Sequence, residues 1–146
     1  MRMRGILSLT ALCFLVACQQ GPTADQMSEQ GREPMSGKEL RQTMVGNTLY
    51  QTGYTQSTKW QWAGYYAPGG EARGRAWWSG GKNEGTGTWE IEGNRWCTEW
   101  SVDEWGEGER NCMHFFRSGD KIDYVIVSGP TDNGTSTLKQ GNPHDL

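Results

Sequence analysis

Residue types that can do chemistry are concentrated between residues 94 and 116, in the run NRWCTEWSVDEWGEGERNCMHFF. Its cysteines could hold a metal, exchange disulfides or form a structural bridge. A zinc site would need closely spaced pairs of ligands, and redox catalysis would need a CxxC pair. Cys97 and Cys112 fit neither spacing, and His114 is the one imidazole near them. The choice depends on the compartment, because paired cysteines persist as disulfides only where the surroundings are oxidising.

The start of the chain indicates that compartment. Arg2 and Arg4 precede a mostly apolar, uncharged run over residues 6–17, which is typical of a secretory signal peptide. The run is too short to cross a membrane, which takes about 20 apolar residues. It ends in LVAC at residues 15–18, which resembles the lipobox of bacterial lipoproteins.

The lipobox resemblance implies that residues 1–17 are removed and that Cys18 becomes the acylated first residue. Gln19 follows, where aspartate often marks inner-membrane retention, so the resemblance favours a lipid anchor in the outer membrane facing the periplasm. The periplasm is oxidising, so a disulfide between Cys97 and Cys112 is the favoured interpretation.

The charge argues against nucleic acid as a partner. The chain has 14 basic and 17 acidic residues, a net charge of −3, and loss of Arg2 and Arg4 would lower it to −5. Nucleic-acid binding proteins carry a basic stripe, whereas residues 98–109 hold acids and no bases. The partners expected from the sequence are therefore a membrane, through the lipid, and a small envelope ligand or a basic protein.

The mature chain divides into a tether and one domain. Residues 18–35 are rich in polar residues, glycine and proline, and are predicted to form a flexible tether. Ser36 and Glu39 have the spacing of a capping box, which predicts a short helix that ends at Gly46. The rest of the domain, to residue 146, has the pattern of β-strands.

Eight strands are predicted, because short runs rich in Thr, Tyr, Trp, Val and Ile alternate with turn signals. Hairpins without helical crossovers favour an all-β fold, an antiparallel up-and-down calycin-like barrel with the helix across one end. A two-sheet β-sandwich is the alternative. The predicted strands span residues 47–54, 58–66, 72–79, 85–92, 94–102, 110–117, 121–128 and 134–140.

From about residue 40 onward the chain contains an ordered set of short segments: Gly46-Asn47-Thr48, Tyr66-Ala67-Pro68-Gly69-Gly70, Arg73-Gly74-Arg75, Gly85-Thr86-Gly87-Thr88-Trp89, Gly93, Cys97-Thr98-Glu99-Trp100, Cys112 and Gly141-Asn142-Pro143. Together these segments resemble a family of small secreted bacterial domains of unknown function. The resemblance implies one envelope domain with two paired cysteines, and it carries no activity with it.

The cysteines predict the register of one hairpin. If Cys97 lies opposite Cys112, Glu99 lies opposite Arg110, which is a favourable charge pair. Trp96 then points to the other face, so we expect that face to be the barrel interior and the disulfide to lie on the outer wall. The acids between the two strands lack the ordered spacing of a calcium loop, so a solvated acidic loop is expected.

No recognisable catalytic motif is present. The sequence contains no GxSxG elbow, P-loop or HExxH, and nothing places two carboxylates across a cleft. We therefore expect a protein that is not an enzyme, with no catalytic residues, no metal and no cofactor.

The eight tryptophans are the compositional anomaly. Trp89, Trp96 and Trp100 alternate as inward strand positions should, so they are expected in the core. Other tryptophans could either contact a ligand or partner, or pack within the protein, because clustered exposed aromatic side chains mark interfaces. The candidate contact residues are Trp60, Trp62, Trp77 and Trp105.

These observations favour a lipid-anchored, non-catalytic binding module for a small envelope ligand or sugar. One alternative is an inhibitor of, or partner for, a basic protein such as lysozyme, acting through the loop at residues 79–82. Further alternatives are a structural envelope protein and a hydrolase that uses the acidic loop. The fold class does not choose among them.

Overall fold

The computed structural model describes residues 21–146, so Cys18 and the predicted signal peptide lie outside the described residues. Within that part of the chain, no helix is both long enough and apolar enough to span a membrane. The elements are α1 (Ala24–Glu29), α2 (Gly37–Met44), β1 (Thr48–Thr55), β2 (Thr58–Tyr66), β3 (Glu71–Trp78), β4 (Gly81–Glu92), β5 (Arg95–Trp100), the 3-10 helix η1 (Asp103–Trp105), β6 (Arg110–Ser118), β7 (Lys121–Ser128) and β8 (Gly134–Lys139).

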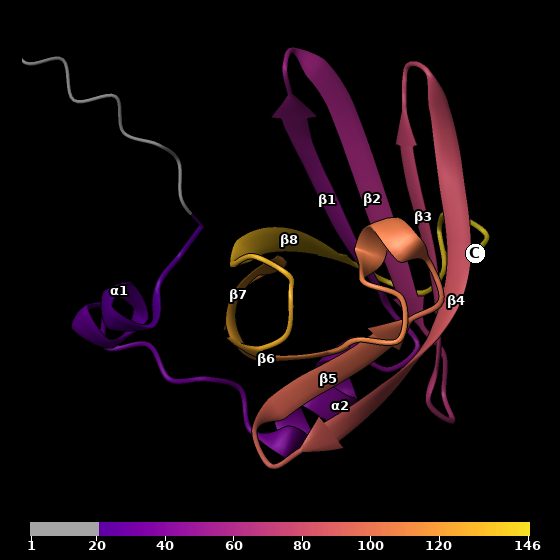
Figure 1. The fold of residues 1–146 in the computed structure, drawn as a ribbon. Helices are drawn as coiled ribbons and strands as arrows, with labels where there is room; N and C mark the ends of the chain where they lie inside the picture. Colours follow the sequence, from indigo (N-terminus) through magenta and orange to yellow (C-terminus); the bar gives the residue numbers. More distant parts are fainter. Residues whose placement is uncertain (1–20) are drawn as a thin grey trace, which may run out of the picture.

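The eight strands form a closed barrel (Figure 1). Each strand pairs antiparallel with the next, and β1 pairs with β8, so no long edge is left open. This confirms the predicted up-and-down barrel and excludes the two-sheet sandwich. The β1–β2 and β3–β4 hairpins project beyond the other strands at one end of the barrel, as Figure 1 shows.

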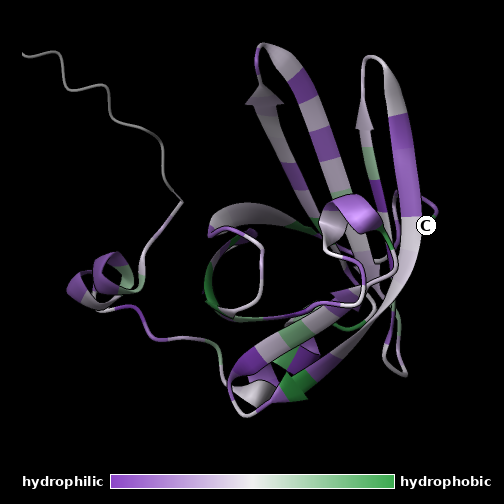
Figure 2. Ribbon diagram, viewed as in Figure 1, coloured by the Kyte–Doolittle hydropathy of each residue, from purple (hydrophilic) through white to green (hydrophobic). Residues whose placement is uncertain are grey.

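Helix α2 fills the other end of the barrel. Its capping box is present, because the Ser36 Oγ accepts from the Glu39 N–H at 3.3 Å and the Glu39 carboxylate accepts from the Ser36 N–H at 2.7 Å. Leu40 and Met44 are fully buried and belong to the main core. Gly46 has φ +79°, a conformation that favours glycine and ends the helix as predicted. Figure 2 shows hydrophobic residues gathered where α2 packs.

The described part of the predicted tether is not a free linker. Residues 24–29 form α1, and Met27 is buried in a small cluster with Phe116 and Val125. The Arg32 guanidinium lies 2.5 Å from the carboxylate of the buried Asp123. Polar composition predicted flexibility here, but two buried methionines, Met27 and Met35, and one ion pair hold the segment against the barrel.

Replacing Arg32 with alanine is expected to lower the free energy of unfolding by about 1.5 to 3 kcal/mol, since charged hydrogen bonds contribute on this scale. Burial of the Asp123 carboxyl would raise its pKa, but hydrogen bonds from Thr135 and Arg32 outweigh this and hold the pKa below its usual range. This stabilisation is present above the unfolded pKa, about 3.9, and is lost as the pH falls through the lower folded pKa.

Urea unfolding at neutral and acidic pH measures this effect. The wild type should lose more stability than the Arg32→Ala variant below about pH 4, because only the wild type has the pair to lose. Arg95→Ala is the matched control, since its pair with Glu92 is 3.4 Å long and both side chains are more than two-fifths exposed. If Arg32→Ala and Arg95→Ala lowered the free energy of unfolding at neutral pH by the same amount, the Arg32 contact would not hold α1 in place.

Candidate ligand cavity

The barrel encloses a cavity of about 500 Å³. Its floor includes Leu49 and Phe115 of the core that packs on α2, and its mouth includes residues of η1 and of the β7–β8 loop. This volume lies within the range of about 300 to 1,000 Å³ typical of small-molecule sites. Aromatic side chains make up much of the wall: Trp60, Trp62, Tyr66, Trp100, Trp105, Phe115 and Tyr124.

Glycines keep this half of the barrel hollow. The Trp62 ring lies over Gly64, where a β-carbon would stand 2.2 Å from the indole. The Trp60 ring lies in the same way over its cross-strand partner Gly53, with a corresponding distance of 2.4 Å. Because these strand positions carry no side chain, the indoles lie against the backbone and leave the centre of the barrel open.

Helix η1 brings Trp105 into the mouth. Gly106, at φ +79°, ends η1, and the Trp105 ring packs against Trp62 and Trp100. The edges of Trp105 and Trp100 reach towards Gly74 of β3, where a β-carbon would lie 2.7 Å from Trp105. The acids of this loop, at positions 103, 104, 107 and 109, are exposed as predicted, whereas Trp105 is half-buried because the short loop folds back over the barrel.

The cavity also presents polar groups. Burial raises the pKa of Tyr66 far above its usual range, so its hydroxyl stays protonated. The Tyr124 hydroxyl accepts a hydrogen bond from Gln51 Nε2 at 2.8 Å, and burial raises its pKa too. Neither hydroxyl donates a hydrogen bond to another described residue, so both can donate to a ligand.

The charge at the mouth is negative. Glu104 and Asp132 line the cavity, whereas no Lys, Arg or His is found among its described lining residues. Close by, the pKa of Glu107 is raised by its hydrogen bond to Asp103 and by the charge of that residue. The site therefore combines aromatic walls, hydroxyl donors and an acidic rim.

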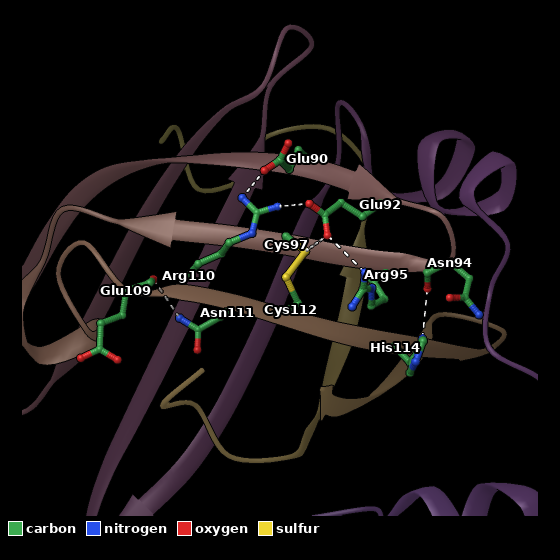
Figure 3. Close-up of a disulfide and its surroundings, with 10 residues drawn as sticks. All are labelled: Glu90, Glu92, Asn94, Arg95, Cys97, Glu109, Arg110, Asn111, Cys112 and His114. Atoms are coloured by element: carbon green, nitrogen blue, oxygen red, sulfur yellow. Dashed lines mark hydrogen bonds and ion pairs between the residues drawn. A yellow bond between two sulfur atoms is a disulfide. The ribbon is translucent and has the colours of Figure 1, made fainter. Parts of the chain in front are cut away.

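The disulfide lies outside this cavity, on the barrel wall (Figure 3). Cys97 is bonded to Cys112 and lies directly opposite it, as predicted. The Arg110 guanidinium contacts Glu90 and Glu92 beside the disulfide. Both sulfur atoms are bonded to each other, so they cannot serve as thiolate ligands with the neighbouring Glu92.

Three of the four predicted contact tryptophans meet in the cavity: Trp60, Trp62 and Trp105. Trp77 does not, because it lies on the outer wall beside Tyr50 and His144. Its neighbour Trp78 pairs with Trp60 on the inner face and is 40% exposed near the hairpin tip.

The sequence did not identify the two tyrosines of the cavity, and it predicted Trp100 as a core residue without a place in the cavity wall. Tyr66 and Tyr124 occupy inward strand positions, which from the sequence look the same as core positions. A glycine opposite an inward aromatic residue on the next strand could have indicated a hollow interior. Gly87 lies opposite Trp100, and Gly134 lies opposite Tyr124.

Comparison of the chain with protein-family models, with curated proteins and with solved structures found no match. The resemblances to lipoproteins and to a small secreted domain therefore stay predictions.

Proposed function

We propose that this protein is a non-catalytic binding module that holds a small ligand inside the barrel. The observation that carries the proposal is the open cavity of about 500 Å³ with aromatic walls. Sites of this kind bury most of a small ligand and orient it with a few polar groups. The Tyr66 and Tyr124 hydroxyls are suited to that second task, because both keep their protons.

The residues that line the cavity give little support for catalysis. The described lining residues include the hydroxyls of Thr98 and Thr131, but no His, Cys, Ser or Lys to act as a stronger nucleophile or as a base that activates them. The two carboxylates, Glu104 and Asp132, stand at the mouth with exposed side chains. Exposed carboxylates of this kind favour electrostatic selection of a ligand over its conversion.

Tryptophan fluorescence, titrated with peptidoglycan fragments, lipids and small cations, tests the proposal. A ligand should change the emission of the wild type, and Trp105→Ala should weaken binding roughly tenfold, the effect of losing about 1.4 kcal/mol. Trp77→Ala is the matched control, since Trp77 lies on the outer wall and should leave the affinity unchanged. Equal losses in both variants, or no response to any compound, would contradict binding in the cavity.

We further propose that the module is anchored through lipid on Cys18. The described chain begins beside the cavity mouth, where a β-carbon on Gly21 would lie 2.2 Å from the Asn133 carbonyl oxygen in the β7–β8 loop. Each residue spans at most about 3.5 Å, so a lipid on Cys18 would hold the mouth close to the membrane surface.

Cys18→Ser should abolish fatty-acid labelling in the producing cells and release the protein into the soluble periplasmic fraction. Stable anchoring takes more than one acyl chain, so loss of the acylated residue should remove nearly all membrane association. A Gln19→Ser variant is the control and should stay labelled. Unchanged labelling of Cys18→Ser would contradict the anchor and leave the cavity proposal standing.

A second candidate function, contact with a partner protein such as a basic lysozyme, rests on a separate exposed aromatic side chain. Trp78 is 40% exposed beside the tip of the projecting β3–β4 hairpin. Inhibition of a lysozyme that is lost in Trp78→Ala and kept in Trp105→Ala would support this alternative over the cavity.

A further inference from the structure

We propose that the cavity recognises an alkylammonium group, the cationic end of a free solute or of a lipid headgroup. The inference rests on the proposed binding function and specifies its ligand. It is carried by three tryptophans of the wall, two acids of the mouth and the hydroxyls beneath them. The three tryptophans are Trp62, Trp100 and Trp105, called here the indole corner.

The rings of the indole corner stand at right angles to one another. Trp62 makes interplanar angles of 87° with Trp100 and 80° with Trp105, and the last two rings meet at 89°. Their centroids are separated by 5.8, 6.3 and 5.2 Å. All three rings line the cavity, and their centroids lie close enough together for one cation over their faces to be within about 6 Å of each, which is the reach of a cation–π contact.

This arrangement suits a rounded cation better than the broad C–H face of a sugar ring. A sugar stacks on one extended aromatic face, whereas perpendicular rings interrupt such a face. Tryptophan gives the strongest cation–π attraction, and desolvation in a cavity strengthens it. Enclosure by several aromatic rings is the arrangement that recognises quaternary ammonium groups.

The charge at the mouth points the same way. Glu104 and Asp132 line the opening, and no cationic side chain lines the cavity among the described residues. Two carboxylates attract a cation and repel a free anion, so they select for the sign of the charge. Deeper in the cavity, Tyr66 and Tyr124 can donate hydrogen bonds to an oxygen carried elsewhere on the ligand.

Calorimetry with a matched pair of probes tests the proposal. The first probe is acetylcholine, and the second is its carbon isostere, in which an uncharged quaternary carbon replaces the nitrogen. The two have the same shape, so a difference in affinity reports the charge alone. We expect acetylcholine to bind about tenfold more tightly to the wild type, and the preference to shrink as salt is added.

Two variants locate the preference. The double change Glu104→Gln and Asp132→Asn should lower the affinity for acetylcholine several-fold and leave the isostere unaffected. Both side chains are at the exposed mouth, so this variant should fold as the wild type does. Trp105→Leu should weaken both probes, because it removes a wall of the site that each of them contacts.

The outcomes separate the ligand class from the binding function. Equal affinity for the two probes would overturn the alkylammonium proposal and leave a cavity that binds by shape. Tighter binding of a peptidoglycan fragment than of either probe would also overturn it in favour of a sugar. If neither probe nor any compound of the fluorescence panel binds, the proposed function fails as well.

A vesicle-binding experiment distinguishes the two possible sources of the alkylammonium group, a free solute and a lipid headgroup. The soluble Cys18→Ser protein is mixed with vesicles of phosphatidylcholine, or of phosphatidylglycerol as the anionic control. If the protein sediments with phosphatidylcholine vesicles and the Trp105→Leu change abolishes this, the ligand is a lipid headgroup. Binding of acetylcholine without sedimentation supports a free solute. Equal sedimentation with both lipids, unchanged in Trp105→Leu, would overturn headgroup recognition by the cavity.

Discussion

Replacing Trp96 with alanine is expected to lower the free energy of unfolding by about 3 to 5 kcal/mol, the usual cost of removing a buried tryptophan. The side chain is fully buried, stacks on Trp89 with ring centroids 4.7 Å apart, and meets Tyr66 at 5.0 Å. The alanine variant would leave a void in the core between the cavity floor and the α2 end of the barrel. Neighbouring side chains are close-packed there and cannot fill the void without moving.

Chemical denaturation measures the Trp96 effect, with Trp77→Ala as the control. Trp77 lies on the outer wall and is not part of the main core, so its loss should cost clearly less. Trp105→Ala should fall between the two, since that ring is partly buried against the core. If Trp96→Ala cost no more than Trp77→Ala, the packed floor described above would be wrong.

Loss of the disulfide should have an effect of similar size. Replacing both Cys97 and Cys112 with alanine is expected to cost about 2 to 5 kcal/mol, and the chain-entropy estimate for a loop of about 15 residues is roughly 3 kcal/mol. Both cysteines are buried, at 1% and 4% exposure, so the bridge should also resist reductant while the protein is folded.

Unfolding of this variant and of the wild type, each with and without reductant, tests the disulfide. Reductant should lower the stability of the wild type, because it reduces the bridge in the unfolded chain, and leave the double variant unchanged. Mass analysis after alkylation, on protein from an oxidising compartment, provides the second readout. Two alkylated thiols in folded protein would contradict a structural bridge.

Most of the barrel could be predicted from the sequence, because its determinants are local. Alternating strand residues and glycine-rich turns placed every strand to within a few residues, and the Ser36–Glu39 spacing placed α2. The register of β5 against β6 followed from Cys97 and Cys112, because a disulfide requires them to lie opposite each other. The predicted charge pair is not formed, since Arg110 lies opposite Glu99 but contacts Glu90 and Glu92.

The rest depends on contacts between distant parts of the chain. Arg32 and Asp123 are separated by 91 positions, and no local pattern pairs them. The direction of Trp105 depends on how a short loop folds over β3, which only the closed barrel defines. The hollow interior depends on which aromatic ring lies over which glycine, as Trp62 does over Gly64.

The hydropathy of the sequence also gave no indication of the cavity. The mean hydropathy of the chain is −0.77, and the projecting hairpins in Figure 2 are mostly white to purple, with a green band on β3. Tryptophan scores as nearly neutral on this scale, although it buries a large apolar surface of about 150 to 250 Å². The aromatic half of the barrel therefore looks polar by composition, while the α2 end looks like a core.

The most direct test of the account follows the indole N–H signals by nuclear magnetic resonance during titration with acetylcholine and with a peptidoglycan fragment. Each of the eight tryptophans has one indole N–H, and single Trp→Phe variants assign its signal. If the cavity is the binding site, the signals of Trp62, Trp100 and Trp105 should shift together and reach saturation, while that of Trp77 stays in place. A saturating shift of Trp77 with the other three unmoved would contradict it.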